Sequence, residues 1–398
     1  MNVPNVVMSG AKPTYSVPSM DDIRNVKPNG LKVVSTFSGC GGTCLGYRMA
    51  GFEIIWASEF IPAAQDTYRL NSDAPLDTHD IREVEARHIL DQIGMAPGDL
   101  DILEGSPPCA SFSTAGKREA GWGKEVKYSD TKQRVDDLFD EYTRLVNDLQ
   151  PKVFVAENVY GLVKGSAKGY FKQILRNLGS CGYRVEVRLL DAAWLGVPQH
   201  RRRLFFMGVR NDLGIAPAFP KPWKFQYTLR DVMPWIRKVN VGQGYSELAY
   251  SDVAQWVEAD IPARTLLASQ LGPNAHTQDG RYIETDITPY AIGKEWDKLK
   301  PGEQSEKYFN LTKPALDVPV PTITSKGASL SAASVVHPIE RRKFTIEELK
   351  IISSFPADFQ MSGTFAQQWE RIGRAVPPLM ARAVAEVIRD EVLAKCSV

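Results

Sequence analysis

One cysteine of the sequence stands in surroundings that favour chemistry over packing. Cys109 follows two prolines in the run Gly105-Ser106-Pro107-Pro108-Cys109. The run comes directly after residues 100–103, whose apolar character predicts a strand, and α/β proteins gather reactive groups at the carboxyl ends of strands. A lone cysteine is more often a small buried hydrophobe. The stiff Pro-Pro turn at this place favours a nucleophilic Cys109 over that alternative.

A glycine-rich turn predicts a ligand site earlier in the chain. Ser38-Gly39-Cys40-Gly41-Gly42 stands between a predicted strand and a predicted helix. Glycines let a ligand approach the backbone closely, and a helix N-terminus offers free N–H groups. Glu59 follows Gly39 by 20 residues, the spacing at which nucleotide-binding units place a carboxylate against ribose hydroxyls. Asp80 is a candidate partner for an adenine amino group.

The turn by itself leaves two alternatives open. One is a tight strand-to-helix connection that binds nothing, and the other is the phosphate turn of a dinucleotide oxidoreductase. Position 44 is cysteine, so the third glycine of the G-x-G-x-x-G pattern is missing. This departure weakens a pyrophosphate site and leaves room for an adenosine cofactor without phosphates, such as S-adenosylmethionine.

Charged residues further along the chain complete the candidate chemistry. Glu157 follows an apolar run, where burial would raise its pKa and favour an acid, although a salt-bridged strand-end carboxylate is the alternative. In an extended segment Gln199, Arg201 and Arg203 would share one face, where two guanidinium groups can brace a base and depress a thiol pKa. Residues 199–238 hold nine Arg or Lys against two Asp. Such an excess suits either nucleic-acid phosphates or a solvated basic face.

The elements that must position these residues follow an α/β pattern. Strands are predicted at residues 33–37, 52–57, 100–103, 152–156, 183–190 and 204–209, and an amphipathic helix at 132–149. Alternating strands and helices predict a Rossmann-like, mostly parallel sheet covered on both faces. We expect a flexible arm at 1–30, a catalytic domain at 31–210, a smaller irregular domain at 211–370, and a segment at 371–398 that returns to the first domain. Thr345 with Glu348 predicts a helix start, and Pro377-Pro378 another.

Bulk properties exclude several classes of protein. The chain has 398 residues, 43% hydrophobic and 24% charged, with a net charge of +1, which is ordinary for a globular protein. No apolar run approaches the ~20 residues of a membrane helix, and no signal peptide is recognisable. Five cysteines fit a reducing compartment, so we expect a cytoplasmic protein. The cysteines other than Cys109 have no histidine partners nearby, so no metal site is expected.

Six motifs in order resemble those of the DNA cytosine-5 methyltransferases, across residues 31–392. Pro108-Cys109 with Phe112-Ser113 resembles the catalytic motif of that family, and Phe37–Gly42 its cofactor motif. Glu157-Asn158-Val159 and Gln199-His200-Arg201-Arg202-Arg203 match its acid motif and its Gln-x-Arg-x-Arg motif. Arg342–Thr345 with Phe355-Pro356 resembles the ninth motif, and Gly373–Pro378 the tenth. The tenth motif usually has asparagine where this chain has Arg374.

The resemblance implies a function and a set of residues. The enzyme would transfer methyl from S-adenosylmethionine to C5 of a flipped-out cytosine in a specific short duplex, with Cys109, Glu157, Arg201 and Arg203 as catalytic residues. It further implies that Arg203 orders the closing loop and that Arg201 faces the base. The implied cofactor-binding residues are Phe37, Ser38, Gly39, Cys40, Gly41, Gly42, Glu59, Phe60, Asp80, Ile81, Gly105, Pro107, Arg374 and Val376. The implied DNA-contacting residues are Ser111, Ser113, Lys117, Arg118 and Gln199.

The resemblance also implies partners and leaves rivals. Double-stranded DNA would be the substrate of a bacterial or phage-encoded monomer, which a cognate restriction endonuclease for the same site would accompany. A tRNA cytosine-5 methyltransferase is one rival, although its Cys-Phe-Thr pattern is missing. A non-catalytic DNA-binding paralogue is another, and it predicts damage at the catalytic positions, all of which are intact.

Overall fold

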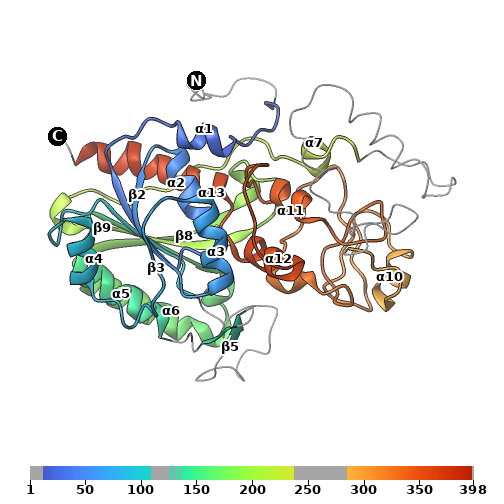
Figure 1. Ribbon diagram of the computed structural model, residues 1–398, viewed down its shortest axis with the longest axis horizontal. Helices are drawn as coiled ribbons and strands as arrows, with labels where there is room; N and C mark the ends of the chain where they lie inside the picture. The colour runs from blue at the N-terminus through green and yellow to red at the C-terminus, as the bar shows by residue number, and fades with distance from the viewer. Residues whose placement is uncertain are drawn as a thin grey trace.

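The computed structural model describes residues 12–108, 126–128, 131–133, 135, 137–236 and 285–396. At its centre lies a seven-stranded sheet in the order β3-β2-β1-β4-β7-β9-β8 (Figure 1). Strands β3, β2, β1, β4 and β7 are parallel neighbours, and β9 runs antiparallel between β7 and β8. The predicted mostly parallel α/β sheet is therefore confirmed. The strands are β1 (Lys32–Thr36), β2 (Glu53–Ser58), β3 (Leu76–Asp77), β4 (Ile102–Gly105), β7 (Val153–Val159), β8 (Tyr183–Asp191) and β9 (Arg202–Arg210).

Helices cover both faces of this sheet, which explains why its central strands are continuous apolar runs. On one face the helices are α4 (Ala86–Ile93), α5 (Leu138–Leu149) and α6 (Lys168–Ser180), and on the other α2 (Gly42–Met49) and α13 (Pro378–Val387) (Figure 1). Val33 and Val34 of β1 point to opposite faces, and both are fully buried. Helix α3 (Pro62–Asn71) follows β2 and packs Ala64 into the core on the α5 side.

The predicted helix at 132–149 begins later than its apolar spacing indicates. Helix α5 starts at Leu138, and the preceding residues form a hairpin of β5 (Val126–Tyr128) with β6 (Thr131–Gln133). Val135 continues the apolar periodicity and is buried in the core without belonging to the helix. The apolar spacing predicted a helix that is too long because Val135 is buried like the apolar residues of α5 but precedes the helix.

The second half of the chain adds short helices to the carboxyl side of the sheet. They are α7 (Leu229–Val232), α10 (Ala291–Trp296), α11 (Ile346–Ile352) and α12 (Phe365–Arg374) (Figure 1). Helix α11 begins with the predicted capping box of Thr345 and Glu348, and α13 begins at Pro378 as predicted. One apolar cluster joins Cys40 and Leu45 to Phe344 and Trp369. Residues on both sides of the predicted boundaries at 210 and 370 therefore belong to one hydrophobic core.

Part of the expected N-terminal arm is packed rather than loose. Helix α1 (Met20–Arg24) buries Met20 and Ile23 in the same cluster as Phe344. Its capping box at Ser19 and a hydrogen bond from the Met20 N–H to Asp358 fix its start. The helix was not predicted because its five residues are too few to show a periodic pattern.

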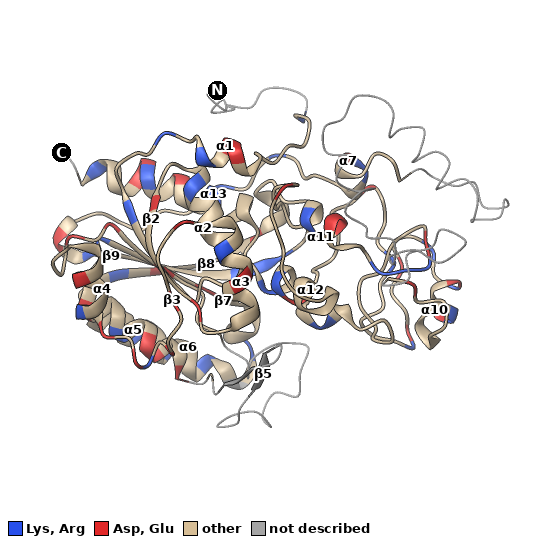
Figure 2. Cartoon of the chain, viewed as in Figure 1, with Lys and Arg blue, Asp and Glu red and all other residues tan. Residues whose placement is uncertain are grey.

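Charge is mixed on the outer helices. Helices α4 and α5 carry both acidic and basic residues, whereas the charged residues of α6 are all basic (Figure 2). Within the described residues, no helix is long and apolar enough to cross a membrane.

Candidate active site

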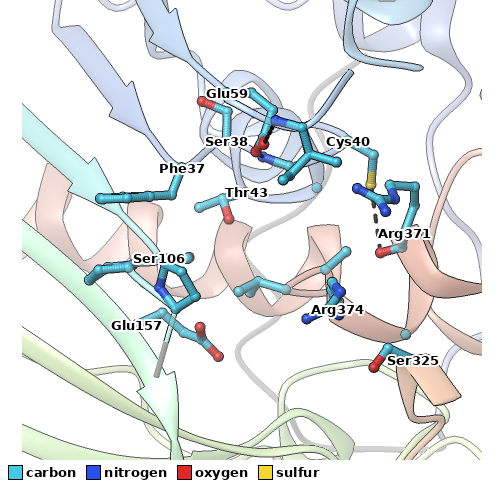
Figure 3. A pocket seen from close by; sticks show the side chains of 18 of the residues that line it. Phe37, Ser38, Cys40, Thr43, Glu59, Ser106, Glu157, Ser325, Arg371 and Arg374 are labelled. Atoms are coloured by element: carbon cyan, nitrogen blue, oxygen red, sulfur yellow. Dashed lines mark hydrogen bonds between the residues drawn. The ribbon is translucent and has the colours of Figure 1, made fainter. Parts of the chain in front are cut away.

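A cavity of about 320 Å³ opens at the carboxyl ends of β1, β2, β4 and β7. Such a volume lies at the lower end of the range of ligand pockets, and the place is the one where open α/β sheets bind ligands. Ser38, Glu59 and Ser106 come from the strand ends, and Ser325 and Arg374 from the opposite wall (Figure 3). Residues as far apart in the chain as Ser38 and Arg374, 336 positions, thus form one site.

The glycine-rich turn between β1 and α2 forms one wall. Phe37, Gly39 and Gly41 all have positive φ angles, of 54°, 57° and 90°, so the turn requires left-handed backbone that favours glycine. The Glu59 carboxylate closes the turn by accepting hydrogen bonds from the Gly39 N–H at 2.8 Å and the Ile61 N–H at 2.7 Å. Burial raises the pKa of Glu59, while these N–H groups and Arg371 act against the rise.

Glu157 and Arg203 meet at the edge of the cavity. Arg203 Nε lies 2.7 Å from a Glu157 carboxylate oxygen, and both side chains are mostly buried. The antiparallel pairing of β7 with β9 sets this contact, because Val159 is opposite Arg203 and Glu157 is two residues away on the same strand. Burial raises the pKa of Glu157, and the positive charges of Arg203 and Arg201 partly oppose the rise. A buried carboxyl beside a cation is suited to give and take back a proton.

Asn158 fixes the start of the cysteine loop. Its side chain is 3% exposed and donates a hydrogen bond to the carbonyl oxygen of Pro107 at 3.1 Å. Ser106, Pro107 and Pro108 line the cavity. Cys109 lies outside the described residues, as do Ser111, Ser113, Lys117 and Arg118, so the structure does not test these five predictions.

Arg201 and Gln199 are buried between the strand ends and the second half of the chain. The Arg201 guanidinium is 1% exposed and donates to the carbonyl oxygens of Ile323, Gly373 and Arg374 at 2.8–3.2 Å. Arg203, and not Arg201, lies beside Glu157. Gln199 is equally buried and donates to the Ser353 hydroxyl. The contact of Arg201 with the base and that of Gln199 with DNA stay predictions. Both side chains join the strand ends to the second half of the chain.

Most of the predicted cofactor residues line the cavity, and three do not. Gly41, Asp80 and Gly105 lie outside its wall as the described residues form it. The Asp80 carboxylate pairs with Arg82 at 2.8 Å, and it is Ile81 and His79 that face the cavity. A Cβ at Gly105 would lie 2.4 Å from the Thr36 hydroxyl oxygen, which explains the glycine by packing. The eleven that line it are Phe37, Ser38, Gly39, Cys40, Gly42, Glu59, Phe60, Ile81, Pro107, Arg374 and Val376.

The opposite wall contains residues that no motif predicted. Thr322, Ile323, Thr324 and Ser325 line it. Arg371 of α12 also lines it, with 5% of its surface exposed. Its Nε and Nη2 atoms are buried and make no hydrogen bond within the described residues, although Nη2 lies 3.3 Å from a Glu370 carboxylate oxygen. No sequence pattern indicated this arginine.

The described residues contain no group of three or more His, Cys, Asp or Glu side chains arranged to hold a metal ion. Cys40 and Cys44 are buried thiols, and burial raises the pKa of Cys40 to about 11. This thiol is therefore protonated at neutral pH and is no rival nucleophile.

Comparisons with known proteins agree with this architecture. The profile of the C-5 cytosine-specific DNA methylase family matches residues 31–390. The type II methyltransferase M.NgoFVII of Neisseria gonorrhoeae is 30% identical over 370 residues, covering 92% of this chain and 89% of the relative. The type II methyltransferase M.DdeI of Desulfomicrobium norvegicum is 30% identical over 387 residues, covering 90% and 88%.

Solved structures show the same fold at lower identity. A DNA modification methyltransferase encoded within a prophage (E. coli) superposes with a TM-score of 0.64 at 21% identity, covering 91% of this chain and 99% of the other. A DNMT2 variant of Spodoptera frugiperda superposes with a TM-score of 0.55 at 16% identity, covering 90% and 99%. With a family match over nearly the whole chain, this protein belongs to the C-5 cytosine-specific DNA methylases, as the sequence motifs predicted.

Proposed function

We propose that this enzyme methylates C5 of a cytosine within a specific short sequence of double-stranded DNA, through a covalent bond between Cys109 and C6 of the base. The observation that carries the proposal is the buried Glu157–Arg203 pair at the cavity edge. It lies next to Asn158, whose hydrogen bond to Pro107 fixes the chain two residues before Cys109. The acid, a cation and the nucleophile's loop thus converge on one place.

The chain's own residues supply the activation of the base. The Cys109 thiolate adds to C6, which breaks the C5–C6 double bond and moves an electron pair toward ring N3. Glu157, whose pKa burial raises, holds a proton at N3, and Arg203 stabilises the neighbouring O2. C5 then carries the electron pair that accepts the methyl group. Transfer of the C5 proton to water, return of the N3 proton to Glu157 and departure of the Cys109 thiolate from C6 then restore the ring and the enzyme.

The cavity residues fit S-adenosylmethionine as the methyl donor. Phe37, Phe60 and Ile81 provide apolar walls for an adenine ring, and the Glu59 carboxylate is suited to ribose hydroxyls. The buried Arg371 donors that make no hydrogen bond among the described residues suit the carboxylate of an amino acid group. When bound, this cofactor supplies an electrophilic methyl group on a sulfonium. The family implies such a donor, and the residues present are the ones that it needs.

Access to C5 requires that the cytosine leave the duplex, because a stacked base cannot meet a thiolate at C6. The predicted closing loop with Ser111, Ser113, Lys117 and Arg118 would contact the opened DNA, and it lies outside the described residues. We expect the residues that read the DNA sequence to lie within 211–335, where the chain does not clearly resemble any motif of the family.

We also propose a biological setting. The relatives named above are type II methyltransferases, which supports a role in a restriction–modification system with an endonuclease for the same site. The enzyme would act as a cytoplasmic monomer, because one flipped base engages one cavity.

Bisulfite sequencing tests the proposal directly. DNA from a methylation-deficient bacterial host that expresses the chain should contain protected cytosines in one short recurring sequence. The same host with Cys109→Ser should contain none, although the variant should still bind duplex DNA. Uniform conversion in both hosts, with soluble protein present, would contradict the proposal and direct attention to an RNA substrate.

A further inference from the structure

A carboxyl group that the reaction does not use lies beneath the cofactor cavity. Glu104 stands near the end of β4, directly opposite Ser35 of β1 in the parallel register, and is 3% exposed. Its carboxylate accepts a hydrogen bond from the Ser35 hydroxyl at 2.9 Å and another from the Thr43 hydroxyl. Hydroxyl groups are its only close polar partners in the described part of the chain.

Within the described residues, no cation compensates this buried acid. Among the groups that shift its pKa, the one charged residue is Glu157, which raises it. Burial has the largest effect, and together they raise the pKa of Glu104 to about 8. The titratable groups coupled to it from the neighbouring elements are acids or neutral donors. They are Cys44 and Tyr47 of α2, Tyr68 of α3, Tyr142 of α5 and Glu157 of β7.

Hydroxyl groups connect Glu104 to the ligand space. Ser35 Oγ lies 2.8 Å from Ser38 Oγ, and Ser38 and Thr43 both line the cavity (Figure 3). The path from the acid to the cavity is therefore Glu104–Ser35–Ser38 on one side and Glu104–Thr43 on the other. The Ser38 hydroxyl has a second acceptor, the carbonyl oxygen of Ser35 at 3.1 Å.

The protonation state of Glu104 sets the direction of these hydrogen bonds. An ionised carboxylate only accepts, so Ser35 and Thr43 turn their protons to it. Ser38 then donates to Ser35, and oxygen lone pairs of Ser38 and Thr43 face the cavity. A protonated Glu104 donates to one of its partners instead, and a hydroxyl proton becomes free to point at the ligand. The buried Tyr47 hydroxyl, which has no hydrogen-bond partner among the described residues, is a further donor for the ionised form.

We propose that Glu104 is a positioning residue that matches the cavity to the charge of the cofactor and thereby favours S-adenosylmethionine over its product. The sulfonium of the donor is cationic, whereas the thioether of S-adenosylhomocysteine is neutral. Lone pairs and a carboxylate beneath the cavity stabilise the cation and not the thioether. Binding of the donor therefore releases the Glu104 proton to solvent, and the product complex takes one up. This inference rests on the proposed cofactor.

Ligand binding measured against pH tests the idea without turnover. The affinity ratio of S-adenosylmethionine to S-adenosylhomocysteine should rise between pH 6.5 and 9.5 in the wild-type enzyme. A one-unit difference in the Glu104 pKa between the two complexes gives a rise of about tenfold. In Glu104→Gln, which keeps the shape and cannot ionise, this rise should disappear. The α-amino groups of both ligands titrate near pH 8, but they contribute equally in both proteins and cancel in the comparison.

Two further variants make the test specific. Ser35→Ala keeps the acid and its contact with Thr43 but removes the path through Ser38, so the rise of the ratio with pH should become smaller than in the wild type without disappearing. Asp140→Asn is the control, because this carboxyl lies on the exposed side of α5 with a raised pKa; it should behave as the wild type. Calorimetry at pH 7.5 in two buffers of different ionisation enthalpy should also detect proton release on binding of the donor to the wild type.

The outcomes separate this inference from the proposed function. An equal pH dependence of the ratio in the wild type and in Glu104→Gln would overturn the role of Glu104 and leave the methyltransferase assignment intact. If Glu104→Gln fails to fold, Ser35→Ala takes its place in the test. An equal pH dependence of the affinity ratio in the wild type and in Ser35→Ala, with no proton release on binding of the donor, would overturn the role of Glu104. If neither ligand binds the wild type at any pH, the proposed cofactor itself is wrong.

Discussion

Arg201 and Arg203 are two residues apart in the chain and have different surroundings. Arg203 lies beside Glu157 at the cavity edge, where a guanidinium can meet a substrate. Arg201 donates to three backbone carbonyl oxygens from the second half of the chain. Burial and the charge of Arg203 lower the pKa of Arg201 well below its usual value. The hydrogen bonds to the three carbonyl groups therefore have to offset the unfavourable burial of a positive charge. Arg203 therefore lies where the proposed chemistry needs a cation, whereas Arg201 joins the strand ends to the second half of the chain.

Substitution of the two arginines should separate these roles. Arg201→Lys leaves at least one buried carbonyl oxygen without a donor, and we expect a loss of about 1–3 kcal/mol in the free energy of unfolding. Arg203→Lys keeps a charge near Glu157 but removes the planar fork, so kcat should fall at least about tenfold with nearly unchanged stability. Urea unfolding and single-turnover methylation measure the two effects. Equal stability loss in both variants would contradict the distinction.

Glu157→Gln should affect the chemical step most. The amide preserves the shape but cannot transfer a proton to N3, so kcat should fall by about 10²–10⁴-fold. Binding of duplex DNA and of the cofactor should change little, because neither depends on that proton. Glu186→Gln on β8, away from the cavity wall, is the matched control. A Glu157→Gln enzyme with wild-type kcat would remove this residue from the mechanism.

At the scale of elements, α2 and α13 must lie very close together to complete the cavity. A Cβ at Gly42 would come within 2.5 Å of the Val376 carbonyl oxygen. The glycine of the first motif and the valine of the tenth are thus in direct backbone contact across 334 positions of sequence. This contact holds Phe37 and Ser38 opposite Arg374 around the cavity.

Gly42→Ala tests the contact. The added methyl group must push residues 375–376, which lead into α13, away from α2. We therefore expect the affinity for S-adenosylmethionine to fall by at least about tenfold, a cost of about 1.4 kcal/mol. Gly179→Ala in α6 is the control, because a Cβ there meets nothing within 4 Å. That variant should gain up to about 1 kcal/mol of stability from helix propensity. Equal affinity for S-adenosylmethionine in both variants would show that the close contact of Gly42 with Val376 is not needed for binding of the cofactor.

At the scale of the whole molecule, a small basic surface formed by Lys164 and Arg202 lies beside the cavity. Lys164 Nζ lies 4.3 Å from the centre of the Tyr160 ring, and the Arg202 guanidinium lies 5.4 Å from it. Tyr160 follows Val159, which lines the cavity, and Arg202 precedes Arg203. The ring therefore holds two exposed cations next to the site where a flipped base would enter.

Removal of these cations should weaken DNA binding without regard to sequence. For Lys164→Ala or Arg202→Ala, we expect the slope of log K against log salt to fall by about 1 for each phosphate that the variant no longer neutralises. The preference for the target sequence should be unchanged. Arg184→Ala, on the edge strand β8 and paired with Glu186, is the control. An unchanged salt dependence of DNA binding in both Lys164→Ala and Arg202→Ala would mean that this surface does not contact DNA.

The sequence alone determined the sheet, the family and the strand-end residues. Apolar runs and a turn pattern are local properties, so they predict β1, β7 and the glycine turn directly. A short motif indicates Glu157 as the candidate acid, and the spacing from Gly39 indicates Glu59 as the candidate partner of the ribose. Capping boxes are equally local, which is why the start of α11 at Thr345 was predictable.

The tertiary structure decided which side chains face the cavity. Alternation predicted that Gln199 and Arg201 share a face with Arg203, but it did not say that this face meets Ser353 and the Gly373 carbonyl group. Arg371 and Glu104 belong to no motif, and only the tertiary structure identifies them. Arg371 has buried donor atoms that make no hydrogen bond among the described residues. Glu104 is a buried acid beside which those residues place no compensating cation. Burial and charge compensation depend on segments hundreds of residues apart, so no local pattern contains them.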